Sequence, residues 1–317
     1  MDSVLAQTFE GWEHLIVDDG PDEETAAFVR ERAKADQRIR YIMRQSEESG
    51  ANVCRNLGLS QARSEFVVFL DDDDLLTPDA LSRRFETMVR NQDLDFAVFA
   101  GEGFCRRPGD FPPTKRLEPS DDILRFLSLD CPWLTTGPIW RRTYIEAMGG
   151  FIPDLSSMQD LELHVRALCS RPRYFTIDTV DHFHRENREL LRTTSRHFSD
   201  PLFIEQSERI PSLLSEYMER AGFNSWSRNR ALLGLGFGTA ERWARIGHLR
   251  TAARVWSRAC TRFGAPTLIR FSGAAMLCIA RSDDGRNGPP GRLLNKWKGW
   301  VRFRQEPSLL RATASRR

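Results

Sequence analysis

Short apolar segments alternate with longer segments of helical periodicity along the chain up to about residue 190. The apolar segments have strand length and many branched or aromatic side chains, and they lie at residues 13–17, 39–43, 66–70 and 96–99. Helical spacing of apolar residues occurs between them, at 23–34, 51–63 and 78–91. Strands that alternate with helices of this length predict an α/β domain built on a parallel-type sheet with right-handed crossovers.

The pattern then changes to shorter elements and finally to helices alone. Further helices are predicted at residues 121–129, 142–148 and 159–169, and short strands at 137–141 and 174–178. After Ser199 only helical periodicity remains, including a hairpin that breaks at Gly247. We therefore predict three parts, namely an α/β domain at 1–198, a helical appendage at 199–285, and a linker with a basic amphipathic tail at 286–317.

Charge is divided unequally along the 317 residues, although the formal net charge is only +2. From Pro201 onward there are 21 Lys and Arg against 8 Asp and Glu, whereas the preceding part has 25 against 36. An acidic first part and a basic second part indicate two different roles. The six cysteines are scattered without a CxxC pair, which favours reduced thiols over disulfides or a zinc site.

No segment has the length and composition of a membrane span. The best candidate, Leu268 to Ala280, is shorter than the ~20 apolar residues that a span needs, and it contains Arg270. The first residues lack the basic and apolar pattern of a signal peptide. We expect a cytoplasmic protein.

Four consecutive aspartates, Asp71 to Asp74, follow the apolar run at 66–70. Like charges at a strand tip raise one another's pKa unless a cation neutralises them, and Mg²⁺ or Mn²⁺ prefers such oxygen ligands. A solvated acidic loop that caps the next helix, with Asp74 as a capping residue, is the alternative. This helix is expected to start with Thr77 as N-cap and Pro78 at the first position.

Several short motifs accompany the aspartates in a fixed order. They are Ser3–Phe9 (SVLAQTF), Ile16–Gly20 (IVDDG), Gly50–Gly58 (GANVCRNLG), Phe69–Asp74 with Pro78–Leu81, Gly149–Phe151, and Gln159-Asp160 with Arg166. In this order the chain resembles the family 2 glycosyltransferases over residues 3 to about 196. The resemblance implies a GT-A-type fold, in which helices flank a nucleotide-sugar-binding sheet, and a metal-dependent, inverting enzyme.

The resemblance implies roles on the donor side of a nucleotide-sugar site. Asp19 corresponds to the residue that reads the nucleotide base, and Asp72 to one beside the ribose. Asp71 and Asp73 correspond to ligands of a divalent metal, Mg²⁺ or Mn²⁺. Arg55 is a candidate for contact with the nucleotide. The alternatives are a turn-forming Asp19 and an Arg55 on a solvated helix face.

The resemblance also implies an acceptor side. Asp160 occupies the place of the general base that takes a proton from the acceptor hydroxyl. An alternative for Asp160 is a helix cap, which is compatible with that role. Gln159 replaces the family's usual Glu at the acceptor contact. His184 and Arg185 are candidates for contact with the diphosphate or the acceptor, with a purely structural His184 as the alternative.

The implied reaction moves a sugar, hexosyltransferase-like, from a nucleoside-diphosphate sugar to a saccharide or lipid-linked acceptor in cell-surface polysaccharide or glycolipid synthesis. One alternative is a non-catalytic remnant that binds metal and nucleotide. A nucleotidyltransferase would need a Gly-rich phosphate loop with a Lys, which the sequence lacks. The family's first strand precedes the motif found at Ser3–Phe9, so we expect a gap in the centre of the sheet.

The last basic segment has two interpretations. Apolar residues at 293, 294, 297, 300 and 301 form one helical face, with Lys296, Lys298 and Arg302 around it. Such a helix is typical of contact with an anionic membrane surface, which would suit a lipid-linked acceptor on the inner membrane face. A helix packed on its own domain is the alternative. No nucleic-acid recognition motif accompanies the charge.

Overall fold

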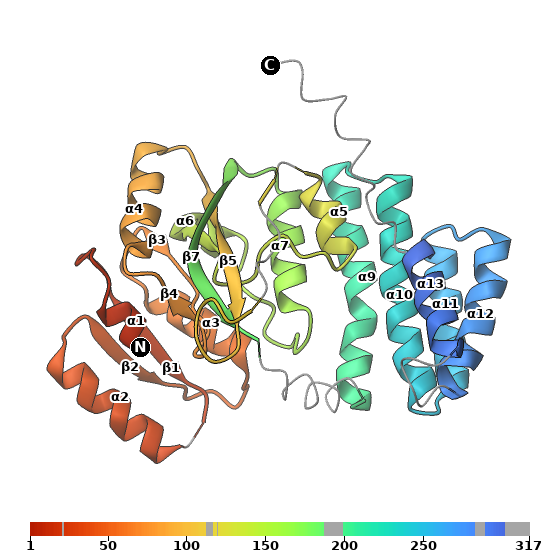
Figure 1. Cartoon of the computed structure of the whole chain (residues 1–317), viewed down its shortest axis with the longest axis horizontal. Coiled ribbons are helices and arrows are strands. Elements are labelled where there is room, and N and C mark those ends of the chain that lie inside the picture. The colour runs from red at the N-terminus through yellow and green to blue at the C-terminus, as the bar shows by residue number, and fades with distance from the viewer. Residues whose placement is uncertain (21, 112–116, 119, 187–198, 283–288, 302–317) are drawn as a thin grey trace. The chain divides into compact units, whose positions relative to one another are not determined.

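A computed structural model of the chain describes residues 1–20, 22–111, 117–118, 120–186, 199–282 and 289–301 (Figure 1). The chain divides into two compact units. Unit 1 comprises residues 1–119, 133–163 and 171–188, and unit 2 comprises 120–132, 164–170 and 189–317. The expected boundary at residue 198, residues 286–288 of the expected linker and residues 302–317 of the expected tail lie outside the described residues, so these limits stay predictions.

Unit 1 begins with α1 (Asp2–Leu5) and a two-stranded parallel sheet. Strand β1 (His14–Asp18) pairs with β2 (Ile39–Met43), with His14 opposite Ile39. Helix α2 (Glu23–Ala35) connects the two strands. It begins after Asp22, because the Asp22 carboxylate caps it by accepting the Glu24 N–H. Helix α3 (Ala51–Gln61) packs against β1. These elements were predicted to within about two residues.

A second sheet of five strands forms the centre of unit 1. Its order is β3 (Phe66–Val67), β6 (Pro138–Arg141), β5 (Phe96–Phe104), β7 (Tyr174–Arg185) and β4 (Leu75–Leu76). Only β5 and β7 pair in parallel, whereas the other three pairings are antiparallel. The expected α/β class is confirmed, but the parallel sheet is a mixed one. Periodicity identifies a strand, and its direction depends on partners distant in sequence.

The β1–β2 pair is not joined to the five-stranded sheet among the described strands. The sequence predicted one sheet with a central gap, and the described strands form two separate sheets. Strand β3 is also shorter than the expected run at 66–70, since only its first two residues pair with β6. The chain leaves the sheet there and carries the aspartates into a loop.

The core of unit 1 lies around β5. Phe96, Ala97 and Val98 are completely buried, and the Phe96 ring lies 4.5 Å from that of Trp140 between ring centroids. Helix α4 (Ala80–Arg90) packs against β5. It begins after Asp79 rather than at Pro78, so the expected Thr77 cap is wrong. Helices α6 (Arg142–Ala147) and α7 (Gln159–Cys169) follow β6.

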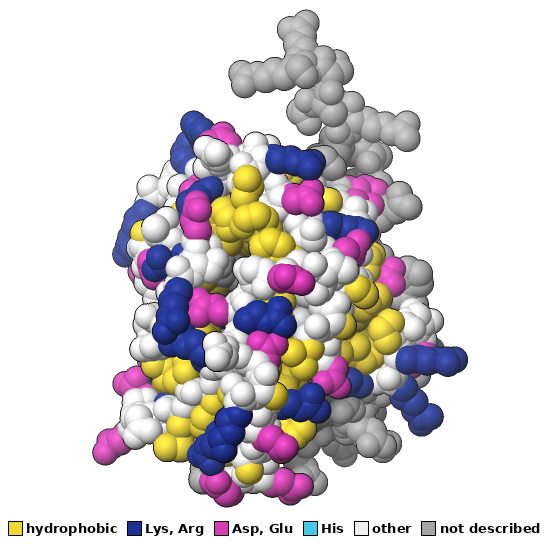
Figure 2. All heavy atoms as spheres, turned by 90° about the vertical axis from the view of Figure 1, so that its left-hand side faces the viewer, with side chains coloured by type: hydrophobic (Ala, Val, Ile, Leu, Met, Phe, Trp, Pro, Cys, Tyr) yellow, Lys and Arg dark blue, Asp and Glu magenta, His cyan; other side chains and the backbone are white. Residues whose placement is uncertain are grey.

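The surface on the side of α2 in Figure 1 is turned toward the viewer in Figure 2. Acidic and basic side chains alternate on this face, with hydrophobic groups between them. Neither sign dominates the face, so it lacks the single-sign field that typically attracts a polyanion.

Unit 2 is helical. It contains α5 (Asp122–Leu127), α9 (Pro201–Ala221), α10 (Trp226–Arg245), α11 (Leu249–Arg262), α12 (Thr267–Ser282) and α13 (Pro289–Val301). Asp200 caps α9, which has Pro201 at its first position, and Ser225 caps α10 through the Arg228 N–H. None of the helices in the described ranges is long and apolar enough to cross a membrane.

Candidate active site

The N-terminal turns of α3 hold the first acidic side chain of the candidate site. Asp19 follows β1, and its carboxylate oxygens accept the Gly50 N–H at 3.0 and 2.9 Å. Arg44 Nε donates to Asp19 Oδ1 at 2.6 Å. Burial opposes ionisation of Asp19, but the hydrogen bonds from Gly50 and Arg44 outweigh it and lower its pKa. Arg44 was missed, although its place directly after β2 was a usable signal.

Arg55, in the second turn of α3, binds a second acidic residue, Asp71. Arg55 Nη2 donates to Asp71 Oδ1 at 2.5 Å, and the guanidinium lies 5.1 Å from the centroid of the Phe151 ring. Only 14 % of the Arg55 side chain is exposed, so it does not lie on a solvated helix face. Helix α3 therefore carries contacts to both Asp19 and Asp71. The role of Arg55 toward a nucleotide stays a prediction.

Asp160 lies in the first turn of α7. The Thr135 hydroxyl donates a hydrogen bond to Asp160 Oδ1. Burial raises the pKa of Asp160, the Thr135 hydrogen bond and the charge of Arg55 act against this rise, and the charge of Asp71 adds to it. The structure thus brings together Asp160, Arg55 and Asp71. Gln159 is the first residue of α7 and is partly buried.

The residue before α7 has an unusual backbone. Met158 has a φ of 55°, in the left-handed region that non-glycine residues rarely adopt. Its carbonyl accepts the Glu162 N–H at 3.0 Å, so the strained residue starts the helix. Glu162 is 1 % exposed, which directs its side chain away from solvent. Strain of this kind fixes the position of the turn that carries Asp160.

The four consecutive aspartates have different surroundings. Asp72 and Asp73 are exposed. Burial, followed by the charges of Asp72 and Asp71, raises the pKa of Asp73, and the charge of Arg185 lowers it. Asp74 is only 8 % exposed, and its oxygens accept the Thr136 hydroxyl at 2.6 Å and the Arg185 N–H at 3.2 Å. Burial raises the pKa of Asp74 to about 6.

The sequence suggested that Asp74 caps the following helix, but its carboxylate has other partners. It connects the acidic loop to the segment before β6 and to the end of β7. The expectation was wrong because four adjacent identical residues give no indication of which one turns inward. The turn itself decides this, since the Asp74 N–H donates to the Asp71 carbonyl at 3.1 Å.

Two buried residues, Arg84 and Asp181, help to hold Thr136, the partner of Asp74, and neither was predicted from the sequence. Arg84 and Asp181 are both 0 % exposed and form two hydrogen bonds of 2.7 Å. Arg84 Nη1 also donates to the Thr136 carbonyl at 2.8 Å. Arg84 occupies the apolar stripe of α4 between Ala80 and Met88, and this misplaced charge was a signal. Thr135 and Thr136 gave none.

His184 and Arg185 end β7. His184 Nε2 lies 3.3 Å from Glu186 Oε1. The Arg185 guanidinium lies 4.4 Å from the centroid of the Phe104 ring, and Nη1 donates to the Cys105 carbonyl at 3.1 Å. Arg185 is thus beside the acidic loop, whereas His184 is engaged with a carboxylate.

A divalent cation is compatible with the chemistry of the acidic loop. Asp72 and Asp73 are exposed carboxylates whose mutual repulsion favours a bound cation, and oxygen ligands suit Mg²⁺ or Mn²⁺. Asp71 Oδ1 is already paired with Arg55. Within the described ranges no three His, Cys, Asp or Glu side chains converge as a preformed metal site.

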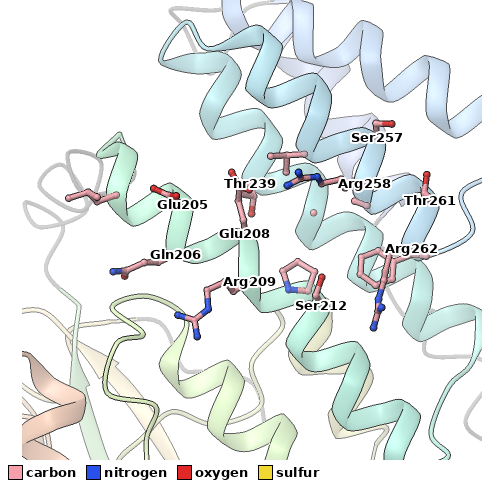
Figure 3. A pocket seen from close by; sticks show the side chains of 16 residues that line it. Glu205, Gln206, Glu208, Arg209, Ser212, Thr239, Ser257, Arg258, Thr261 and Arg262 are labelled. Atoms are coloured by element: carbon pink, nitrogen blue, oxygen red, sulfur yellow. The ribbon is translucent and has the colours of Figure 1, made fainter.

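Two hollows of the described structure lie away from the predicted site residues Asp19, Asp71 to Asp74 and Asp160. A hollow of about 920 Å³ lies in unit 2 among α9, α10 and α11 (Figure 3). It is lined by Glu205, Glu208, Arg209 and Arg258 among others, and by none of the predicted site residues. A hollow of about 540 Å³ in unit 1 is bordered by Met43 of β2 and Asn56 of α3. Among the acids, Asp19, Asp72 and Asp73 are exposed, whereas Asp74 is buried.

Residues 1–132 match the family described as Glycosyl transferase family 2. This part of the chain belongs to that family. Asp19, Arg55 and Asp71 to Asp74 lie within the family 2 match, whereas Asp160, His184 and Arg185 lie beyond it. The roles of both groups of residues stay predictions.

Two relatives and one solved structure illustrate the likeness. The chain is 35 % identical over 108 residues to the GalNAc(5)-diNAcBac-PP-undecaprenol beta-1,3-glucosyltransferase of Campylobacter jejuni, covering 34 % of each chain. It is 39 % identical over 124 residues to a Bacillus subtilis protein named as a teichuronic acid biosynthesis glycosyltransferase, TuaG, covering 39 % of this chain and 47 % of that one. The chain thus matches about a third to a half of the length of these relatives.

The structure of S. aureus TarS 1-349 in complex with UDP-GlcNAc is similar with a TM-score of 0.63 and 17 % identity. The similarity covers 95 % of this chain and 85 % of TarS. At this identity the likeness concerns the fold, and it agrees with the expected GT-A-type family 2 architecture with a helical C-terminal region.

Proposed function

We propose that the chain is an inverting glycosyltransferase that moves a sugar from a nucleoside-diphosphate sugar to an acceptor hydroxyl. The observation that carries this proposal is the meeting of Asp160, Arg55 and Asp71, which come from α7, α3 and the acidic loop. Donor-side and acceptor-side groups would thus lie at one place in unit 1.

On the donor side, we assign the nucleotide base to Asp19, the ribose to Asp72, and a divalent cation to the loop at Asp73 and Asp71. The low pKa of Asp19 keeps it an acceptor of hydrogen bonds from a base. A bound cation would act as a Lewis acid that stabilises the departing nucleoside diphosphate. Arg185, beside Asp73, would add a positive charge toward the same group.

On the acceptor side, Asp160 would take the proton of the acceptor hydroxyl while the oxygen attacks the anomeric carbon and the bond to the diphosphate breaks. A raised pKa makes the carboxylate a stronger base near neutral pH. Thr135 would orient the carboxylate, and Arg55 would limit the rise in its pKa. Gln159 would contact the acceptor.

We assign the acceptor to the saccharides and lipid-linked saccharides of cell-surface polysaccharide or glycolipid synthesis. The support comes from the names of the relatives, one of which acts with an undecaprenol-linked substrate and the other in teichuronic acid synthesis. Since the chain covers only part of these proteins, the specific sugar and acceptor need measurement.

The experiment is a thermal-shift panel of UDP-, GDP- and dTDP-sugars with and without Mn²⁺, followed by transfer and donor hydrolysis assays. A specific donor at 100 times its Kd should stabilise the protein by about 2.7 kcal/mol. Asp73→Asn should lose Mn²⁺-dependent donor binding, whereas Asp93→Asn, at an exposed surface ion pair with Arg173, should retain it.

Equal donor affinity in wild type and Asp73→Asn would contradict the assignment of the loop. Binding without any transfer or hydrolysis, across the whole panel, would instead support the alternative of a non-catalytic remnant.

A further inference from the structure

Helix α12 in unit 2 has an apolar outer face. On α12, Ile269 and Leu277 are buried against the neighbouring helices. Leu268 and Phe271 lie on the opposite side, and each is 73 % exposed. Ala275 continues the same stripe at helical spacing and is exposed too. Helix α12 is therefore apolar on its outer face as well as on its packed face.

The surroundings of this stripe are basic. Helices α11, α12 and α13 contain no Asp or Glu. Arg254 on α11 and Arg292 and Lys296 on α13 are exposed. Arg270 of α12 itself donates to the carbonyls of Ala265 and Cys260 and so terminates α11. The outer face of α12 is thus uncharged, with cations on the adjoining helices.

Helix α13 borders this stripe on one side. Trp297 Nε1 donates to Ser272 Oγ of α12 at 3.0 Å, which fixes the two helices beside each other. Leu293 lies one turn before Trp297, hence on the side of α13 that contacts α12, and it is 51 % exposed. Leu293 thus adds an exposed apolar side chain on the helix that borders the stripe.

Membrane contact was one of two interpretations of the tail helix, and the structure favours the other. Leu294 and Val301 are 0 and 1 % exposed, and the Trp297 ring lies 4.4 Å from that of Phe237 between centroids. Leu294, Trp297 and Val301 of the face expected to enter a membrane are therefore packed within unit 2, as the alternative interpretation held, whereas Leu293 stays half exposed. Deleting this helix would expose the core of unit 2 and could not test membrane contact.

We propose that the outer face of α12, formed by Leu268, Phe271 and Ala275 and extended by Leu293 of α13, binds the surface of an anionic lipid bilayer. The apolar side chains would enter the boundary between headgroups and acyl chains, and the flanking Arg and Lys would meet lipid phosphates. With 16 residues, α12 is too short to span the bilayer and would lie in its plane.

Charge favours a bilayer over a second copy of the chain as the occupant. Two copies that joined through this face would bring two acid-free basic surfaces together, and like charges would repel. An anionic surface supplies the opposite sign. This binding is independent of sugar transfer, so it can be present or absent whatever the outcome of the donor panel.

The experiment measures cosedimentation of the full chain with vesicles of phosphatidylcholine alone and of phosphatidylcholine with phosphatidylglycerol. The double variant Leu268→Ser/Phe271→Ser should bind the phosphatidylglycerol vesicles at least about tenfold more weakly than wild type. The matched control, Leu202→Ser/Trp226→Ser, removes side chains that are 69 and 64 % exposed on α9 and α10. It should bind like wild type, and all variants should melt at the same temperature.

A second arm tests the charges. Arg292→Glu/Lys296→Glu should weaken binding to the anionic vesicles at low salt, since these side chains are exposed and lie beside the apolar stripe. Wild type that ignores the anionic vesicles, or an apolar double variant that binds as well as wild type, would overturn the proposal. A third result would also overturn it. The wild-type chain would form a dimer in sedimentation velocity and fail to bind vesicles, and the Leu268→Ser/Phe271→Ser variant would be a monomer.

Discussion

Four identical residues in a row, Asp71 to Asp74, have three different environments. Asp71 pairs with Arg55, Asp72 and Asp73 face solvent, and Asp74 is buried beneath Thr136 and the Arg185 N–H. Composition alone gives them the same pKa. Burial raises the pKa of Asp74 to about 6, because desolvation disfavours its charged form.

Asp74 should make the protein less stable as the pH rises. Its pKa of about 6 exceeds the ordinary value of 3.8, so between these values the folded chain retains a proton that the unfolded chain releases. Stability then falls through this window, by no more than about 3 kcal/mol at neutral pH. Asp74→Asn keeps both hydrogen bonds, because the Thr136 hydroxyl can reverse its direction.

The measurement is urea unfolding of the metal-free protein at pH 4 and 7.5. Asp74→Asn should raise the free energy of unfolding at pH 7.5 and change it little at pH 4. The same change at both pH values would show that the charge of Asp74 is not the cause.

Asp160 should control turnover rather than donor affinity. Asp160→Asn is expected to lower the transfer rate by about 10²- to 10⁴-fold and to leave donor binding nearly intact. In the wild type, the acidic limb of the pH–rate profile should lie above the ordinary pKa of an aspartate, as burial raises this pKa. Thr135→Val removes a hydrogen bond that favours the charged form, so the limb should move to still higher pH.

Transfer and donor-binding assays on the three proteins are the measurement. An Asp160→Asn variant that retains almost the full transfer rate would place the base elsewhere. An unchanged acidic limb in Thr135→Val would remove Thr135 from its orienting role.

At the scale of elements, one buried ion pair joins the parts that carry the acids. Arg84 of α4 pairs with Asp181 of β7 and holds the Thr136 carbonyl before β6. The His182 ring nitrogen Nδ1 lies 2.9 Å from Asp181 Oδ1 in the same cluster. A helix and two strands are therefore fixed through a single guanidinium.

Removing this guanidinium should be far more costly than removing its neighbour on the same helix. Arg84→Met leaves the buried Asp181 charge without its partner, and we expect a loss of about 3–5 kcal/mol of unfolding free energy. Arg83→Met removes a surface pair with Asp79 and should cost at most about 1 kcal/mol. Urea unfolding of both variants is the measurement, and equal losses would contradict a special role for Arg84.

Periodicity predicted the helices of unit 1 after α1 and the strands β1 and β2 to within a few residues, but it ended the two longest strands, β5 and β7, well before Phe104 and Arg185. It did not predict β4, because two residues have no period, nor the antiparallel directions in the second sheet. Acidic residues at strand ends were found because four charges after a buried strand are unusual. Their partners were not found, because Arg84 and Asp181 meet across 97 residues of sequence.

At the scale of the whole molecule, the division of charge along the sequence resembles the division of the structure into two units. The acidic candidate site belongs to unit 1, whereas α11, α12 and α13 of unit 2 carry no acid at all. The sequence suggested two roles from charge alone, and it gave the second role to the tail. Charge could not show which helix presents an exposed apolar surface. The apolar stripes of α12 and α13 are similar in sequence, and only the packing shows that the stripe of α13 is largely buried.

The exposed stripe of α12 has a consequence for kinetics. A chain held flat on a bilayer would meet a lipid-linked acceptor by lateral diffusion in two dimensions, at an effective concentration set by the area of membrane that both share. Its rate would then follow the mole fraction of acceptor in the surface rather than the amount of acceptor per volume of solution. Diluting the acceptor with inert lipid would slow such an enzyme, whereas diluting the whole suspension with buffer would not.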